Sequence, residues 1–418
     1  MDPHGAYEEA LERYAAEGVD AAAALEVLER VSLSVHCWQA DDVAGFERND
    51  SDLGGSGLAV TGNYPGRPRT MEELRQDLAK AFSLIPGQHR LSLHASYGDF
   101  SQGFPGRDRI GPEHFESWVE WAREQGLKLD FNATFFGHFM VKEGYTLASR
   151  DKGVREYWIE HGRRCREISS YLGSQLDDIC IHNIWIPDGS KDLTPNRAFH
   201  RQYLKESLDS ILAHPVTPGT MKDSVESKLF GIGTESFVAG SHEFYLGYAL
   251  ERGTLLTLDI GHFHPTESVA DKVSALFLYL DELLFHITRG IRWDSDHVVA
   301  FNDPLLELMQ ELVWSGHLQD AHLGLDFFDA TINRVGAYVI GARNTLKALL
   351  WALLLPTDRL RHYEEEGRYF ERLALYEEFK SMPFGAVWDR FCVMHDTPPG
   401  TAYLGEIRKY EEEVLLQR

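Results

Sequence analysis

Cysteine is scarce in this chain. Its four cysteines, Cys37, Cys165, Cys180 and Cys392, are far apart in 418 residues and form no CxxC pair. Disulfide frameworks and thiolate zinc sites both need cysteines at close, regular spacing, so neither is expected here. The scarcity agrees with a protein that works in the reducing cytoplasm.

Basic residues are few relative to acidic ones. The chain has 41 Lys and Arg against 65 Asp and Glu, which gives a net charge of −24. Nucleic acids and anionic membranes are normally bound by clustered Lys and Arg. We therefore expect neither as a partner, and the acidic excess by itself indicates a solvated surface.

Long hydrophobic runs are also missing. The N-terminus, MDPHGAYEEA, is acidic and has no apolar core, which excludes a signal peptide of the usual kind. The longest apolar run, Ala348 to Leu355, is much shorter than the roughly 20 residues that cross a bilayer. Hydrophobic residues still make up 43% of the chain, which is enough for a large buried core. The sequence predicts a soluble cytoplasmic protein.

Eight short runs rich in β-forming residues recur through the middle of the chain. They read SLSVHCW, RLSLHASY, LKLDFNATF, ICIHNIWI, DSVESKLF, LLTLDIGHF, LLFHITRG and HLGLDFFD. Most of the gaps have helical patterning with start signals, such as Pro112 before EHFESWVEWAREQG. Eight alternating βα units predict a (β/α)8 TIM barrel over residues 31–355.

The seventh run has a second interpretation. LFLYLDELLFHITRGIRWDSDH could form one long helix, or a helix that leads into a strand near Leu283. Gly290 and the β-branched Ile287 and Thr288 favour the strand. On this interpretation IRWDSDHVV is the loop that leaves the seventh strand.

The two ends of the chain are predicted to be additional N-terminal and C-terminal helices, over residues 1–30 and 356–418. Asp20 is expected to cap the helix that begins AAAALEVLER. These helices either pack subunits together or form a solvated cover for the barrel, and the sequence leaves both open.

Polar residues gather at the carboxyl ends of the last four predicted strands, where barrel enzymes keep their chemistry. They are Glu226, Asp259, His262, His264, His286, Asp294, Asp296, Asp326 and Asp329. Unpaired carboxylates in a barrel mouth are costly, so cations must compensate them. One divalent ion takes roughly six ligands, and this set is too large for one ion. The sequence therefore predicts two ions that share a carboxylate; manganese, magnesium, cobalt and zinc all suit the donors.

Each of these residues alone has a simpler interpretation. A single histidine beside an apolar strand is more often a hydrogen-bonded core residue than a ligand, and DxD in a loop is usually a turn. The coincidence of four successive strand ends outweighs these alternatives. His322, at the start of the eighth strand, should lie at the opposite mouth and is interpreted as structural.

Lys228 and three aromatic residues are the candidates for substrate contacts. Lys228, two residues beyond Glu226, either neutralises the carboxylates or polarises a substrate oxygen, and we favour the second. Trp38, Trp185 and His94 end the first, fourth and second strands and could form an apolar wall with one polar handle for a sugar. The alternative for the tryptophans is core packing.

The glycine-rich segment LGGSGLAVTGNYPG, residues 53–66, is not a phosphate loop. It lacks GxxxxGK[ST] and does not join a strand to a helix. We interpret it as a mobile cover over the barrel mouth that could reach a neighbouring subunit's site.

Seven stretches resemble the L-rhamnose isomerase family, and the likeness runs over nearly the whole chain. They are VHCWQADDVAGFE, VTGNYPG, NIWIPDG, ESKLFGIG, DIGHFHPTE, RWDSDHV and GLDFFDATINR. The resemblance implies a bacterial cytoplasmic homotetramer that converts L-rhamnose to L-rhamnulose, the first step of L-rhamnose degradation, with Mn²⁺ or a similar divalent ion.

The resemblance also implies roles for the strand-end residues. His262, Asp294 and Asp296 would hold the catalytic ion, while Glu226, Asp259, His286 and Asp326 would hold a structural one. Asp259 would bridge both, and His297 would orient a ligand.

Moving hydrogen between C1 and C2 places further demands on the site. Lys228 could donate a hydrogen bond to O1, and Asp326 could hold a water through which O1 and O2 exchange protons. The resemblance implies a hydride shift, and an enediol formed by a protein base remains the alternative.

Other function classes predict different features. A two-metal hydrolase or nuclease would need a basic rim to grip phosphate, which this acidic chain lacks. A sugar epimerase would want paired acids flanking one carbon. A noncatalytic sugar-binding protein would not need two metals. Another aldose–ketose isomerase or an epimerase on the same barrel is the nearest alternative.

Overall fold

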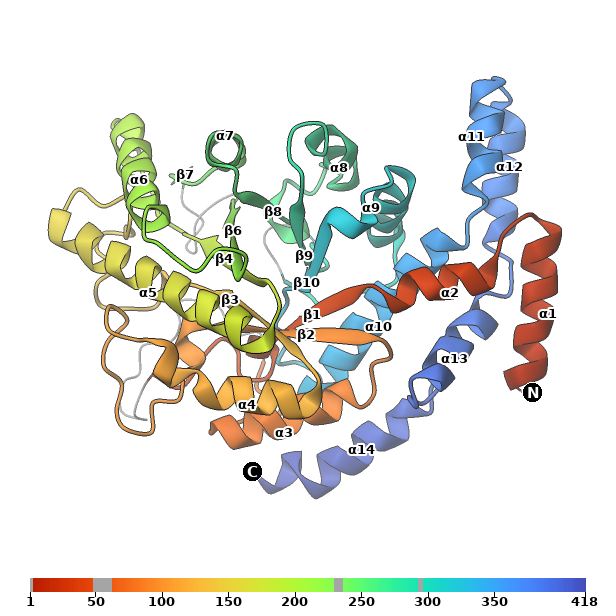
Figure 1. Ribbon diagram of the computed structural model, residues 1–418, viewed down its shortest axis with the longest axis horizontal. Coiled ribbons are helices and arrows are strands. Elements are labelled where there is room, and N and C mark those ends of the chain that lie inside the picture. Colours follow the sequence, from red (N-terminus) through yellow and green to blue (C-terminus); the bar gives the residue numbers. More distant parts are fainter. Residues whose placement is uncertain (1–2, 48–61, 229–235, 292–295) are drawn as a thin grey trace.

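Eight parallel strands close into a barrel, which confirms the predicted fold class (Figure 1). The computed structural model describes residues 3–47, 62–228, 236–291 and 296–418. The spatial order of the strands is β1-β10-β9-β8-β6-β4-β3-β2. They are β1 (Ser32–His36), β2 (Gln88–His94), β3 (Lys128–Asn132), β4 (Cys180–Trp185), β6 (Met221–Glu226), β8 (Leu255–Asp259), β9 (Leu283–Ile287) and β10 (Ala321–Leu325). A short antiparallel pair is formed by β5 (Gly189–Ser190) and β7 (Phe237–Val238).

Each of the eight expected runs overlaps one barrel strand, and the seventh strand begins at Leu283 as favoured. Helices alternate with the strands. They are α3 (Met71–Phe82), α4 (Glu116–Gln125), α5 (Lys152–Leu176), α6 (Arg197–Leu212), α7 (His242–Arg252), α8 (Ala270–Leu276), α9 (Asp303–Trp314) and α10 (Arg334–Leu353). Thr70, Asp151, Asn302 and Asn333 cap α3, α5, α9 and α10 by accepting backbone N–H groups.

The ends of the chain are helical and pack on each other. The N-terminal helices are α1 (Pro3–Ala16) and α2 (Ala21–Glu29), and the C-terminal ones are α11 (Thr357–Glu365), α12 (Tyr369–Phe379), α13 (Phe384–Met394) and α14 (Tyr403–Glu413). Asp20 caps α2 as expected, accepting from the N–H groups of Ala22 and Ala23. Helix α1 contacts α13, whereas α11 and α12 project from the body (Figure 1).

Among the helices in the described ranges, none is by itself long and apolar enough to cross a membrane, and α10 with α11 passes that test only as a pair bent by 53°.

Strand register brings the polar strand ends to one level. Parallel strands place all their carboxyl ends at the same mouth. Asp259 of β8 lies opposite His286 of β9, which lies opposite Gly324 of β10. Side chains alternate along a strand, so Phe285 and Ile287 face the opposite side from His286 and are fully buried. This apolar side fastens the barrel to its helices and leaves the mouth free for polar groups.

Candidate active site and metal centre

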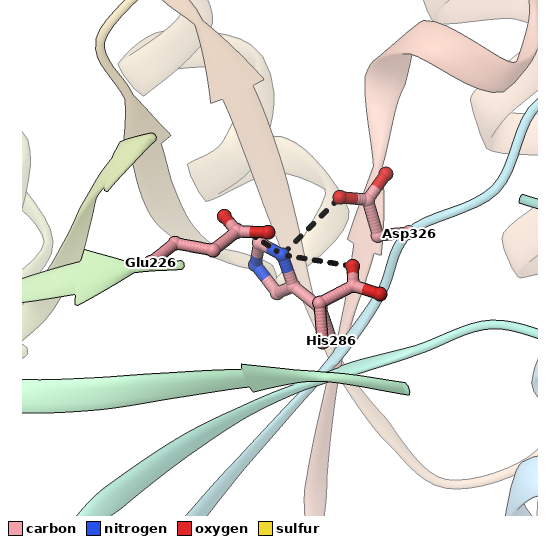
Figure 2. Close-up of side chains that lie close together, drawn as sticks. Glu226, His286 and Asp326 are labelled. Atoms are coloured by element: carbon pink, nitrogen blue, oxygen red, sulfur yellow. Dashed lines mark ion pairs between the residues drawn. The ribbon is translucent and has the colours of Figure 1, made fainter. Parts of the chain in front are cut away.

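Four donors from different strands meet at the barrel mouth. One ligand atom from each of Glu226, Asp259, His286 and Asp326 lies within 4.8 Å of the others. Nδ1 of His286 is 3.2 Å from Oδ2 of Asp326, 3.4 Å from Oε2 of Glu226 and 3.8 Å from Oδ2 of Asp259. Figure 2 shows the carboxylates of Glu226 and Asp326 turned toward the ring of His286.

These donors fit a divalent cation. Nδ1 of His286 and Oδ2 of Asp259 are buried, and neither makes a hydrogen bond within the described part of the chain. Buried polar atoms of this kind are costly unless something compensates them. An ion held by these oxygen and imidazole donors would satisfy all of them at once, so the four residues form a metal-binding cluster.

A second cluster shares Asp259 with the first. Ligand atoms of Asp259, His262 and Asp296 lie within 4.8 Å of one another. Nδ1 of His262 donates to the carbonyl oxygen of Ser227 at 2.9 Å, which makes Nε2 the ligand nitrogen. A Cβ atom at Gly261 would lie 3.2 Å from Oδ1 of Asp296, so glycine lets the two loops approach closely. Asp294, which was expected here, lies outside the described residues.

The electrostatics of the cluster also favour a bound cation. Burial raises the pKa of Asp259 to about 7, and the carboxylates of Glu226 and Asp326 add to this shift. Burial alone would lower the pKa of His286, but Glu226 and Asp326 raise it well above its usual value. Protons on His286 and, in part, on Asp259 therefore offset some of the negative charge of the cluster, and a metal ion that bound here would release them.

Side chains outside the two clusters orient the donors. The indole N–H of Trp38 donates to Oδ1 of Asp326 at 3.0 Å, which leaves Oδ2 facing His286. The amide of Asn183 donates to Oε2 of Glu226 at 2.5 Å. The sequence reasoning assigned no role to Asn183, although its place near the end of the fourth strand was a usable signal.

A pocket opens beside the clusters and contains every residue expected to touch substrate. It is lined by Trp38, Val43, His94, Asn132, Phe136, Asn183, Trp185, Glu226, Lys228, His262, Asp296, Asp326 and Phe328. Strand β6 ends at Glu226, yet the side chain of Lys228 is buried and lies 4.7 Å from the ring centroid of Trp185. Val43, Phe136 and Phe328 make part of the wall apolar.

His94 enters this pocket as a neutral group. Its Nδ1 and Oγ1 of Thr134 are hydrogen-bonded at 2.9 Å. Burial lowers the pKa of His94 to about 3. The ring can therefore donate or accept a hydrogen bond at neutral pH without adding charge.

His264 and Asp329 belong to neither donor cluster and do not line the pocket, so the expectation that all nine polar strand-end residues gather at one site was wrong for these two. His264 is exposed and its Nδ1 is hydrogen-bonded to Oγ1 of Thr266 at 2.7 Å. Oδ1 of Asp329 accepts from the N–H of Thr331 at 2.8 Å and from its hydroxyl at 2.6 Å. Both lie beyond the strand ends, where local turns determine side-chain direction.

His322 lies where the sequence predicted. It is the second residue of β10, at the opposite mouth, and its Nε2 is 2.7 Å from Oε2 of Glu282. The carbonyl oxygen of His297 accepts from the backbone N–H of Arg289 at 3.0 Å and from the hydroxyl of Thr288 at 3.2 Å. Its expected role in orienting a ligand stays a prediction.

The contact between Trp38 and Asp326 predicts an effect on metal affinity. Trp38→Phe removes the N–H but keeps an aromatic ring, and we expect the Kd for Mn²⁺ to rise about 10- to 100-fold, because loss of such an orienting partner typically has this effect. Calorimetric titration of metal-stripped protein measures it. Trp185→Phe is the matched control, because the indole N–H of Trp185 makes no hydrogen bond within the described ranges. Equal shifts in both variants would contradict the prediction.

Known proteins identify the family. Residues 1–418 match the family described as L-rhamnose isomerase (RhaA). A protein of Rhodopirellula baltica named L-rhamnose isomerase is 54% identical over 413 residues, which cover 99% of this chain and 96% of the relative. One of the same name from Bacteroides thetaiotaomicron is 53% identical over 414 residues, covering 99% and 98%. A D-psicose 3-epimerase structure from Clostridium cellulolyticum aligns with 77% of this chain and 96% of its own, at 11% identity and a TM-score of 0.43, which is too distant to inform on activity. The chain belongs to the L-rhamnose isomerase family.

Proposed function

We propose that this protein interconverts L-rhamnose and L-rhamnulose by moving hydrogen between C1 and C2 of the open-chain sugar. The observation that carries the proposal is the pair of donor clusters that share Asp259, beside a pocket with aromatic walls and a buried lysine. Relatives named L-rhamnose isomerase at 54% and 53% identity support the same substrate. The apolar wall of the pocket suits the methyl end of a 6-deoxy sugar.

The proposal includes two divalent ions, with manganese as the native metal. Glu226, Asp259, His286 and Asp326 would hold the structural ion. His262, Asp294 and Asp296 would hold the catalytic one, with Asp259 bridging the two. Such ions, when bound, supply Lewis acidity that holds and polarises neighbouring sugar oxygens. The purely oxygen and imidazole donor set supports manganese, cobalt, magnesium or zinc over metals that prefer thiolates.

The remaining pocket residues bind and orient the sugar. Lys228, fixed over the ring of Trp185, is proposed to donate a hydrogen bond to O1, where negative charge develops. His94 is proposed to contact a sugar hydroxyl as a neutral group. Asp326, whose Oδ1 is held by Trp38, is proposed to lie on the path by which a proton passes from O2 to O1.

Hydrogen is proposed to cross as a hydride. Among the described residues that line the pocket, the carboxylates of Glu226, Asp296 and Asp326 all belong to the two donor clusters. His94 is a weak base, because burial lowers its pKa to about 3. Neither these carboxylates nor His94 is therefore suited to take a proton from C2. The C2 hydrogen moves with its electron pair to C1, and a proton moves from O2 to O1.

Isotope labelling tests this route. With L-rhamnose deuterated at C2, we expect the label to appear undiluted at C1 of L-rhamnulose, because a hydride does not exchange with water. Nuclear magnetic resonance of the product measures it. Unlabelled sugar turned over in D₂O should gain no deuterium at C1, and loss of the label to water would overturn the hydride route in favour of an enediol.

Metal removal and replacement test the proposed function itself. Metal-stripped protein should form almost no ketose from L-rhamnose, and added Mn²⁺ should restore turnover. L-mannose, L-xylose and D-allose, assayed beside it, should be converted more slowly. The same series with Mg²⁺, Co²⁺ and Zn²⁺ ranks the metals. Metal binding without ketose formation would contradict the proposal and direct the search to epimerised products.

The proposal also includes a homotetramer in the cytoplasm. On the projecting helix α12, Tyr369, Phe370 and Leu373 are 60%, 80% and 60% exposed. Exposed large apolar side chains that cluster are typical of contact surfaces between proteins, which supports self-association through this helix. Four buried free cysteines agree with a reducing compartment. Light scattering on the purified protein tests the subunit number.

A further inference from the structure

The loop after β1 contains two consecutive residues in a conformation that their side chains disfavour. Asp42 and Val43 have φ angles of 59° and 58°, in the left-handed region. Such an angle is rare for a β-branched residue, because its side chain crowds the backbone. It persists only where surrounding contacts impose it, commonly at functional sites. Val43 is buried and lines the pocket beside the metal clusters.

A buried ion pair holds this turn in place. Nη1 and Nη2 of Arg334 donate to Oδ1 and Oδ2 of Asp42, each at 2.9 Å. Both side chains are only 3% exposed. A two-point contact of this kind fixes the orientation of the carboxylate as well as its position. Arg334 is the first residue of α10, so the contact joins the loop after β1 to the end of the loop after β10.

The preceding aspartate is anchored in the opposite direction. Oδ2 of Asp41 accepts from the N–H of Gly45 at 2.9 Å, and its Oδ1 accepts from the hydroxyl of Tyr97, which follows β2. A Cβ atom at Gly45 would lie 2.6 Å from the carbonyl oxygen of Ser96, so the loop is pressed against the β2 side. Asp41 is therefore hydrogen-bonded to Tyr97 on the β2 side, and the adjacent Asp42 is paired with Arg334 on the β10 side. The backbone turns sharply between these two contacts.

We propose that Arg334 is a positioning residue for the sugar pocket: through Asp42 it holds the left-handed turn that places Val43 in the pocket wall. The inference rests on the proposed function, because Val43 matters only if a sugar occupies this pocket. Arg334 itself does not line the pocket, so its effect on the sugar would pass through Asp42; its Nε also donates to the carbonyl oxygen of Tyr64 at 3.4 Å. Loss of the pair should therefore weaken sugar binding more than it slows the chemical step.

Two double variants separate this role from a merely structural one. Arg334→Met with Asp42→Gly and Arg334→Met with Asp42→Ala both remove the two charges, so neither leaves a buried charge unpaired. Glycine adopts the left-handed turn without strain, whereas alanine does not. We expect the KM for L-rhamnose to rise about tenfold in the alanine variant and to stay within about threefold of wild type in the glycine variant, since a tenfold change needs only a modest difference in free energy. The kcat and the metal content should be unchanged in both.

A direct binding measurement accompanies the kinetics. Trp38 and Trp185 line the pocket, so quenching of tryptophan fluorescence by L-rhamnose reports sugar binding without turnover. If the KM for L-rhamnose is the same in the glycine and alanine double variants, and the Kd is also the same in both, the inference is overturned. The ion pair would then serve only to hold α10. If neither double variant folds, Arg334→Lys tests the inference instead, since lysine keeps the charge but cannot make the two-point contact. A wild-type KM for L-rhamnose in Arg334→Lys would also overturn the inference. Wild-type protein that fails to isomerise L-rhamnose would instead overturn the proposed function, and this inference with it.

Discussion

Asp259→Asn is expected to abolish isomerisation of L-rhamnose and to leave the protein unable to hold either ion. Asp259 belongs to both donor clusters, and asparagine keeps its shape but lacks the negative charge. Loss of about 4 kcal/mol of charge stabilisation in the transition state corresponds to about a 10³-fold lower kcat. Ketose formation measures the rate, and elemental analysis of the dialysed protein measures metal per subunit.

Variants of residues in only one cluster are the controls. Glu226→Gln should remove one ion, and His262→Asn should remove the other, because each belongs to a single cluster. The metal-free Asp259→Asn protein should melt no lower than metal-free wild type, because the substitution removes a buried carboxyl group. A variant that retained both ions would show that Asp259 does not bridge them.

Lys228→Met is expected to lower kcat by about 10² to 10³-fold while leaving the metal content unchanged, an effect typical of losing one donor at a developing oxyanion. The lysine is 6% exposed and lies over Trp185 in the pocket. Methionine fills similar volume without the charge. Steady-state kinetics with L-rhamnose and elemental analysis measure both quantities.

Lys222→Met is the matched control. Lys222 lies near the start of the same strand, β6, where its ammonium group pairs with Glu282 at the opposite mouth. Its replacement should leave kcat within about twofold, since it is remote from any oxyanion. If Lys228→Met instead lost metal, the lysine would serve to balance the carboxylates, which is the other interpretation that the sequence left open.

The sequence predicted the barrel and the positions of most donors for one physical reason. Parallel strands end at the same mouth, so polar residues such as Asp259 and His286 that follow apolar strand residues must converge. The rule weakens with distance from the strand. It was wrong for His264 and Asp329, because a short local turn satisfies each side chain where it lies.

Contacts between residues far apart in the sequence could not be predicted from the sequence. The hydrogen bond from Trp38 to Asp326 joins the first and last strands of the barrel, and no local pattern marks it. The left-handed angle of Val43 contradicts the intrinsic preference of valine, and the ion pair that we propose to hold it joins Asp42 to Arg334, which is 292 positions away in the sequence. Both features depend on closure of the barrel and on how the loops after its strands pack against one another.

The pairing of β1 with β10 has a consequence for biosynthesis. The first barrel strand leaves the ribosome early, but its neighbour on one side is the last to be made. Asp326, which directly follows β10, therefore cannot reach Glu226, Asp259 and His286 until most of the chain has been translated. A nascent chain that stalls before this strand has only an incomplete ligand set, so the four-residue cluster can form only after all eight barrel strands have been made.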